Sequence, residues 1–362
     1  MILEYAILEN LRIYCESLLT EKLLKENLGG VKIPKFRLKQ IFRHFFHGEK
    51  RDFSSCFDIP KSLRNDISDI ILEIQKKLPV VQKIIKSSDG TEKALFQTFD
   101  GKNFESVLIR QKKRNTVCLS TQIGCPVGCK FCATGALGFE RNLESFEILS
   151  QVDFWSGENR KLQNKIDNIV FMGQGEPFLN FENLKDSVET LNSPFAYGFG
   201  ARKITVSTVG IIPKIYEFSK VLRGQSNLAV SLHFPNQKLR EKYIPVAKNY
   251  NLSDLIQSLL EYVKETNKKV FFEYVLLSGI NTKSETLREL VSIMKKSHLF
   301  HLNLINYNYT GMEFKKAADQ EILRIKNFLH KCRIPFTFRI SFGEENFSAC
   351  GQLGKIFDNK DV

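Results

Sequence analysis

The first 90 residues of the chain repeat apolar side chains every three to four positions. This spacing is typical of helices that bury one face. Prolines that can open a helix stand at Pro34 and Pro60. The helix after Pro34 has an opposite face that is basic and includes Lys35, Arg37 and Lys39. We therefore expect a small helical domain over 1–90, whose basic face either docks nucleic acid or is simply solvated.

The hydrophobic period changes to two between residues 91 and 114. Apolar and polar side chains alternate over 94–99 and over 104–109, and an Asp-Gly dipeptide between them is a strong turn signal. We predict a β-hairpin linker over 91–114. The alternation also places Glu105 on an apolar face, where a carboxylate is costly unless it is paired or used chemically.

From residue 115 onward, short apolar runs alternate with helical stretches. Strand candidates lie at 115–119, 168–172, 203–207, 227–233, 269–275, 301–305 and 335–340. Helix candidates lie near 143–155, 181–191, 212–220, 252–265, 283–296 and 317–331. Repeated strand–helix units predict a parallel sheet covered by helices, with the active site at the C-terminal ends of the strands.

The number of strand–helix units limits the architecture. Six units are too few for the closed eight-stranded barrel. We therefore expect an α/β fold with a partial (βα)6 barrel over 115–345. A C-terminal segment over 346–362 follows it.

Composition and charge narrow the classes of function. The chain of 362 residues carries 53 Lys and Arg against 40 Asp and Glu, a net charge of +13. This excess favours an anionic partner, such as nucleic acid or an anionic lipid surface. No apolar run approaches the roughly 18–20 residues of a membrane span, and the acidic start is unlike a signal peptide, so we expect a cytosolic protein.

The eight cysteines are the most informative residues. In a cytosolic chain they are more typical of metal ligands, catalytic thiols or core residues than of disulfides. Cys125, Cys129 and Cys132 follow the first predicted parallel strand in a glycine-rich loop with C-x₃-C-x₂-C spacing. Zinc sites and 4Fe-4S clusters usually take four protein ligands, so three cysteines suggest a cluster with one iron open to another molecule. A zinc site completed by a distant residue, or buried unligated cysteines, are the alternatives.

The sequence around this loop resembles the radical S-adenosylmethionine superfamily, and within it the RNA adenine carbon-2 methyltransferases. The resemblance extends over about residues 20–355. The motifs that carry it are Cys118-Leu-Ser-Thr-Gln-Ile-Gly-Cys125, Cys132-Ala-Thr-Gly and Gly138-Phe-Glu-Arg-Asn-Leu143. The resemblance implies one 4Fe-4S cluster on the three loop cysteines, with S-adenosylmethionine bound at the open iron and two such molecules used per turnover.

The resemblance also implies cofactor contacts at the ends of later strands. These residues are Gly175, Glu176, Ser207, Ser231, Leu232, His233 and Asn308. A carboxylate such as Glu176 can bind an ammonium group, and the glycine before it lets the backbone approach closely. Asn306 stands where the family usually has proline, so Asn303 or Asn306 could take the place of Asn308.

Two more thiols and a carboxylate complete the implied chemistry. In the family, a cysteine that corresponds to Cys350 is methylated by one cofactor molecule, and a radical from the second activates that methyl group for addition to adenine. By the same resemblance Cys118 would release the product as a transient disulfide with Cys350, and Glu105 would accept the carbon-2 proton. The alternatives are an ordinary thiol at Cys350 and an ion pair with Arg or Lys at Glu105. Cys15, Cys56 and Cys332 match no motif.

The implied activity is methylation of carbon 2 of an adenosine in 23S ribosomal RNA, and in some bacteria of a transfer RNA adenosine. We expect a monomer that needs an electron donor and a disulfide reductant. One alternative is the carbon-8 methyltransferase of the antibiotic-resistance sister family, which more usually has alanine where this chain has Pro177. The others are a radical enzyme that acts on a protein or metabolite, and an RNA-binding module with a structural cluster.

Overall fold

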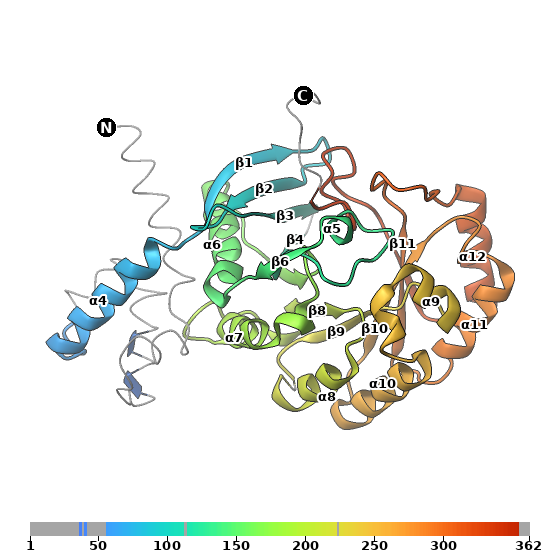
Figure 1. Ribbon diagram of the computed structural model, residues 1–362. Helices are drawn as coiled ribbons and strands as arrows, with labels where there is room; N and C mark the ends of the chain where they lie inside the picture. The colour runs from blue at the N-terminus through green and yellow to red at the C-terminus, as the bar shows by residue number, and fades with distance from the viewer. Residues whose placement is uncertain (1–35, 38–39, 42–55, 112–113, 223, 355–362) are drawn as a thin grey trace.

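The computed structural model describes residues 36–37, 40–41, 56–111, 114–222 and 224–354 (Figure 1). Lys35 and Lys39 of the predicted basic face lie outside these residues, as does most of the helix after Pro34. No helix in these ranges is both long enough and apolar enough to cross a membrane.

The described chain is organised around one ten-stranded sheet of order β1-β2-β3-β4-β7-β8-β9-β10-β11-β12. Its strands are β1 (Val80–Lys86), β2 (Glu92–Gln97), β3 (Asn103–Gln111), β4 (Arg114–Cys118), β7 (Asn168–Phe171), β8 (Ile204–Thr208), β9 (Asn227–Ser231), β10 (Val270–Leu276), β11 (Phe300–Asn306) and β12 (Phe336–Arg339). The first four strands form an antiparallel meander. Six parallel pairings then connect β4 through to β12.

Helices follow the parallel strands and cover the sheet from outside (Figure 1). They are α6 (Ser145–Lys161), α7 (Phe181–Asn192), α8 (Ile212–Val221), α9 (Gln237–Tyr243), α10 (Leu252–Thr266), α11 (Ser284–Met294) and α12 (Asp319–Lys331). Before the sheet, α4 (Lys61–Gln75) begins directly after Pro60, as predicted. A short helix α5 (Ala133–Ala136) and a two-stranded sheet of β5 (Gln122–Gly124) and β6 (Phe139–Asn142) frame the cysteine loop.

This architecture confirms the expected α/β fold with an open parallel sheet. Every predicted parallel strand is present, and its ends lie within two residues of the prediction. The predicted hairpin is also present as β2 and β3. However, β3 pairs with β4 as well, so the segment expected as a linker over 91–114 is continuous with the main sheet.

The helical prediction for residues 1–90 is wrong at its C-terminal end. Strand β1 occupies Val80–Lys86 and pairs antiparallel with β2. The three apolar residues Val81, Ile84 and Ile85 stand three and four positions apart, so they imitate a helical stripe. Pairing with the neighbouring hairpin decides in favour of the strand, because tertiary context overrides local spacing.

A buried charge fixes the first helix of the parallel region to the hairpin. Glu147 is fully buried in the first turn of α6, where it completes a capping box with Glu144. Its carboxylate accepts hydrogen bonds from Arg141 Nη1 at 2.7 Å and Nη2 at 2.8 Å. Arg141 also reaches Asp100 in the turn between β2 and β3, with an Nη2–Oδ1 distance of 2.8 Å.

We expect Arg141→Ala to lower the free energy of unfolding by about 3 kcal/mol, because Glu147 would be left as an uncompensated buried charge. Urea unfolding followed by circular dichroism measures the change. The matched control is Lys161→Ala, which removes an exposed cation from a pair with Glu158 on the same helix and should cost about 0.5 kcal/mol or less. Equal small effects of the two variants would contradict the assignment.

Candidate active site

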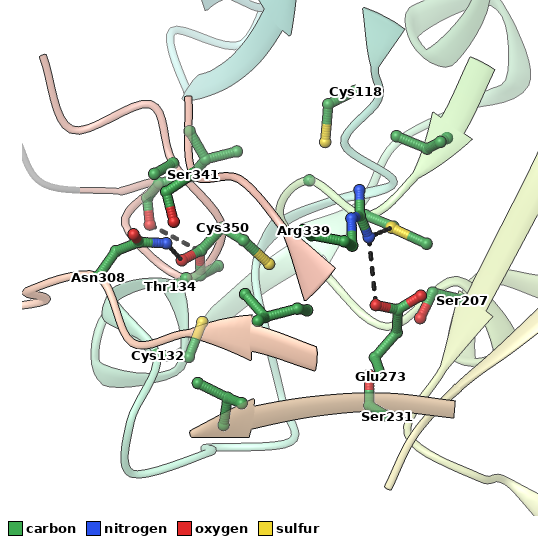
Figure 2. A pocket seen from close by; sticks show the side chains of 18 of the residues that line it. Cys118, Cys132, Thr134, Ser207, Ser231, Glu273, Asn308, Arg339, Ser341 and Cys350 are labelled. Carbon is green, nitrogen blue, oxygen red and sulfur yellow. Dashed lines mark hydrogen bonds and ion pairs between the residues drawn. The ribbon is translucent and has the colours of Figure 1, made fainter. Parts of the chain in front are cut away.

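A cavity of about 470 Å³ opens at the C-terminal ends of the parallel strands. Its wall includes most of the residues singled out from the sequence, which are Cys118, Cys125, Cys129, Cys132, Gly175, Glu176, Ser207, Ser231, His233, Asn308 and Cys350. Figure 2 shows Cys118, Cys132 and Cys350 entering this space from different segments of the chain. The cavity therefore gathers residues separated by more than 200 positions in the sequence.

The cysteine loop is held compact by its backbone. Gly124 has a φ of +73°, and a Cβ there would lie 2.1 Å from the carbonyl oxygen of Gly138. That carbonyl accepts a hydrogen bond of 2.7 Å from the Cys125 N–H, so the loop closes tightly where the ligands begin. The Ala133 N–H donates to the Gly351 carbonyl at 2.8 Å, which ties the loop to the C-terminal segment.

The loop thiols are strongly desolvated. Burial raises the pKa of Cys125 to about 12 and that of Cys129 well above its usual value. Such thiols stay protonated unless a cation compensates the thiolate, which is what a metal centre provides. Among the described residues no three His, Cys, Asp or Glu side chains gather closely enough to ligate a single metal ion. In a 4Fe-4S cluster, by contrast, each cysteine binds a different iron.

Gly175 and Glu176 lie beyond the end of β7. Gly175 has a φ of +101°, and a Cβ there would lie 2.6 Å from Gln122 Cβ. The Glu176 carboxylate accepts hydrogen bonds from the Phe178 N–H at 3.0 Å and the Val209 N–H at 2.7 Å. Burial nevertheless raises the pKa of Glu176 to about 7. This carboxylate is therefore pre-positioned and gains from the arrival of a positive charge.

His233 presents a neutral imidazole to the cavity. Its Nδ1 accepts a hydrogen bond of 3.1 Å from the Val275 N–H, which leaves the ring hydrogen on Nε2. Burial, and secondly the nearby cation of Arg240, lower the pKa of His233 to about 3. The Phe131 ring packs edge-on against the imidazole, with the ring centroids 5.0 Å apart. The ring is thus fixed as a hydrogen-bond donor at neutral pH.

Leu232 differs from the expectation. It does not belong to the cavity wall, because its side chain is fully buried in the core. Its carbonyl accepts a hydrogen bond of 2.6 Å from Arg240 Nη1. The backbone of Leu232 is therefore engaged behind the cavity, between Ser231 and His233, which both face it.

Of the three candidate asparagines, only Asn308 lines the cavity. Its Nδ2 donates to the Cys350 carbonyl at 3.1 Å, and its buried Oδ1 has no partner among the described residues. Asn303 instead donates to Glu273 at 2.9 Å, and Asn306 donates to the Ala317 carbonyl at 3.3 Å. An unpartnered buried acceptor is costly, so Asn308 Oδ1 is suited to a donor on a bound molecule.

Cys118 and Cys350 face the cavity as free thiols. Burial raises the pKa of Cys118 to about 12 and that of Cys350 to about 11, although Cys350 keeps part of its surface open to solvent. Arg339 opposes both shifts and lines the same cavity as the two thiols (Figure 2). Sequence reasoning missed Arg339 and its ion pair with Glu273 at 3.2 Å. The sequence did contain a signal for this pair, because Glu273 and Arg339 are charged residues within the predicted strands 269–275 and 335–340.

Glu105 does not line the cavity in this arrangement. Its Oε1 forms an ion pair of 2.9 Å with Lys93 Nζ, and its Oε2 accepts a hydrogen bond of 2.6 Å from the Gly354 N–H. Lys93 Nζ also donates to the Phe347 carbonyl at 3.2 Å. The carboxylate is therefore covered by the C-terminal segment, and the pairing that the sequence left as an alternative is present.

Comparison with known proteins identifies the family. Residues 119–291 match the family model of the radical SAM superfamily. A curated relative from Clostridioides difficile, named probable dual-specificity RNA methyltransferase RlmN, is 39% identical and covers 93% of this chain and 96% of its own. A protein of the same name from Dictyoglomus turgidum is 38% identical over 92% of this chain and 94% of its own.

A solved structure agrees with these relatives. The crystal structure of a radical SAM methyltransferase from Sphaerobacter thermophilus superposes with a TM-score of 0.83 at 38% identity. It covers 93% of this chain and 98% of the solved one. The chain therefore belongs to the radical SAM superfamily and, within it, to the RlmN family of RNA methyltransferases.

Proposed function

We propose that this protein methylates carbon 2 of an adenosine in 23S ribosomal RNA, and that a transfer RNA adenosine is a second substrate. The observation that carries the proposal is the shared cavity, whose wall holds Cys118 and Cys350 together with the three cysteines of the loop. An adenine carbon 2 is neither acidic nor nucleophilic, so its methylation requires radical chemistry and a carrier for the methyl group. The dual specificity in the names of the relatives supports the two RNA classes.

The cofactors of the family are a 4Fe-4S cluster and S-adenosylmethionine, with two molecules of the latter used per turnover. We assign the cluster to Cys125, Cys129 and Cys132, whose desolvated thiols gain a compensating charge from it. A cluster held there would supply the single electron that radical chemistry on S-adenosylmethionine requires. The polar groups of Glu176, Asn308 and His233 in the same wall fit the amino acid end of that cofactor.

The remaining cavity residues bind and orient this cofactor in our proposal. Glu176 receives the ammonium group, and Gly175 lets the backbone come close to it. Asn308 Oδ1 accepts a hydrogen bond and so satisfies its unpaired lone pairs. His233 donates through Nε2, and Ser207 and Ser231 contribute hydroxyl groups to the wall.

Cys350 is assigned as the methyl carrier and Cys118 as the residue that releases the product. A methylated Cys350 holds its carbon as a thioether within the cavity until that carbon bonds to the adenine. Attack of the Cys118 thiolate on the Cys350 sulfur then forms a disulfide and breaks the sulfur–carbon bond. The electron pair of that bond goes to the carbon, which takes up a proton to complete the methyl group. A thiol reductant must restore both residues.

Glu105 is assigned as the acceptor of the carbon-2 proton. In the described arrangement its Oε2 is bonded to the Gly354 N–H, four residues after Cys350 in the same segment. A displacement of this segment that carries Cys350 toward the substrate also breaks that hydrogen bond. The base is thereby uncovered in the same movement that delivers the methyl carrier.

We infer further that the enzyme acts as a monomer in the cytosol, where RNA, a one-electron donor and a thiol reductant are all present. The net charge of +13 favours contact with RNA phosphates. The exposed Arg114 belongs to the cavity wall, where it can meet a phosphate.

The decisive test is nucleoside mass spectrometry of ribosomal and transfer RNA from cells that lack the protein, complemented with variants. We expect the wild-type protein to restore 2-methyladenosine in both pools. Cys350→Ala should reduce it below detection, because no methyl carrier remains. The appearance of 8-methyladenosine would instead support the sister activity, and its presence without 2-methyladenosine would overturn the proposal.

Cys332→Ala is the matched control for this test. Cys332 is a half-buried thiol at the end of α12 and is not part of the cavity wall. This variant should restore 2-methyladenosine to the wild-type level. Undiminished RNA methylation by Cys350→Ala would defeat the carrier mechanism.

Gly175→Ala should weaken binding of S-adenosylmethionine at least tenfold. The added Cβ would lie within 2.9 Å of the Gln122 backbone nitrogen at a strained φ of +101°. Equilibrium dialysis on the cluster-loaded enzyme measures the affinity. Gly200→Ala serves as the control, since a Cβ at Gly200 meets nothing within 4 Å and its φ is not strained, and we expect unchanged binding there.

Binding of S-adenosylmethionine should weaken as the pH falls through 7. The pKa of Glu176 is raised to about 7 by burial, so its carboxylate is mostly ionised at pH 8 and mostly neutral at pH 6. If only the ionised form holds the ammonium group, the affinity falls up to about tenfold over this range. Calorimetric titration at several pH values measures it, and Glu176→Gln should bind weakly at every pH. A pH-dependence that persists in this variant would refute the assignment.

A further inference from the structure

A cation is buried beside the strand ends of the cavity, and no carboxylate of the described residues forms an ion pair with it. Arg240 in α9 is 1% exposed, which makes it one of the largest fully buried side chains in the described chain. Its Nη1 donates to the carbonyls of Ser231 at 2.9 Å and Leu232 at 2.6 Å, and its Nη2 donates to the Val209 carbonyl. Its Nε has no partner among the described residues. All of its hydrogen-bond acceptors are neutral backbone oxygens.

Arg240 lies directly behind the strand ends that form the cavity. The three carbonyls that it holds lie at the end of β9 or directly after β8 and β9, and Ser231 and Val209 are both part of the cavity wall. The helix that carries it also supports the cysteine loop, because the Tyr243 carbonyl at the end of α9 accepts a hydrogen bond of 3.0 Å from the Lys130 N–H. The helix that carries this guanidinium is therefore joined to the loop that bears the cluster ligands.

The charge of Arg240 requires compensation. Removing an arginine from water is unfavourable, and neutral carbonyls satisfy its hydrogen bonds without cancelling its charge. A guanidinium remains protonated at physiological pH. Glu176 is a carboxylate that acts on it through space without forming an ion pair with it. It belongs to the wall that we assign to the cluster and its cofactor.

We propose that Arg240 is a positioning residue that acts as the buried counter-cation of the 4Fe-4S cluster and favours its reduced state. The proposal rests on the assignment of the cluster to Cys125, Cys129 and Cys132. The potential of such a cluster depends on the net charge of its surroundings, on hydrogen bonds and on solvent exposure. One-electron reduction adds a negative charge, and a fixed positive charge nearby stabilises that product more than the oxidised form.

The test is a redox titration of the cluster, followed by electron paramagnetic resonance in the absence of S-adenosylmethionine. Arg240→Gln keeps amide donors for the strand-end carbonyls but removes the charge. We expect its one-electron reduction equilibrium to become at least tenfold less favourable, which corresponds to a midpoint shift of 59 mV to more negative values. Arg240→Lys keeps the charge and should shift the equilibrium less than threefold.

Arg324→Gln is the matched control. Arg324 is exposed and also donates to a backbone carbonyl, that of Thr282 at 2.7 Å, but it lies on α12 and outside the cavity wall. Its removal should leave the midpoint unchanged. An unchanged midpoint in Arg240→Gln, or equal shifts in the Gln and Lys variants, overturns the counter-cation role.

The remaining outcomes are also decisive. If Arg240→Gln fails to take up iron while Arg240→Lys takes up the full complement, the charge requirement is supported, since both variants lose the planar guanidinium. If neither variant takes up iron, Arg240 has a structural role and the proposal is wrong. A wild-type protein without a 4Fe-4S spectrum would contradict the cluster assignment itself, which is a separate failure.

Discussion

Desolvation of ionisable groups in one cavity is the constraint on which the site depends. Burial moves Cys118, Cys125, Cys129 and Glu176 toward their neutral protonated forms, and it moves His233 toward its neutral deprotonated form. A protein surface would leave these groups near their ordinary pKa values. The cavity therefore holds few free charges of its own and responds strongly to charge that arrives with a cofactor.

The parallel sheet makes this desolvated space available. Successive strands end at one edge, so short loops after β4, β7, β8 and β9 bring their polar residues to a common centre while the strands stay in the core. The buried Arg240 and the half-buried Arg339 stand at this edge in different settings. Arg339 is paired with Glu273, whereas Arg240 bonds only to backbone carbonyls. Arg339 therefore has a permanent negative partner in Glu273, whereas Arg240 is available to stabilise negative charge that a bound cofactor brings.

The parallel strands and the cysteine loop could be predicted from the sequence, because the spacing of apolar residues and of cysteines reflects local backbone geometry. The strands of the parallel region carry continuous apolar runs, and the cysteine spacing lies within one loop. What could not be predicted depends on contacts between distant segments. The helical spacing of β1 is resolved only by its pairing with β2. The partners of Glu105 come from Lys93 on a neighbouring strand and from Gly354 near the other end of the chain. Likewise, no motif identifies Arg240, whose importance follows only from its burial.

Polar contacts hold the C-terminal segment, which follows β12, against the β1–β2 turn at the opposite edge of the sheet. Ser88 Oγ donates to Glu345 at 2.7 Å, and the Gly343 N–H donates to Asp89 at 2.7 Å, so the turn between β1 and β2 holds the chain that continues from β12. The opposite edges of an open sheet are thus joined by the segment that bears Cys350. The same segment supplies a large part of the cavity wall, including Ser348, Ala349, Gly351 and Leu353.

One consequence concerns space rather than charge. The backbone around Cys350 forms part of the cavity wall. A movement of this segment that displaces the thiol therefore opens additional volume at its former position. The cavity of about 470 Å³ also has to hold the cofactor, so the volume that Cys350 vacates adds to the room for a nucleobase. In the proposed mechanism, delivery of the methyl carrier and enlargement of the space for the base are then one movement.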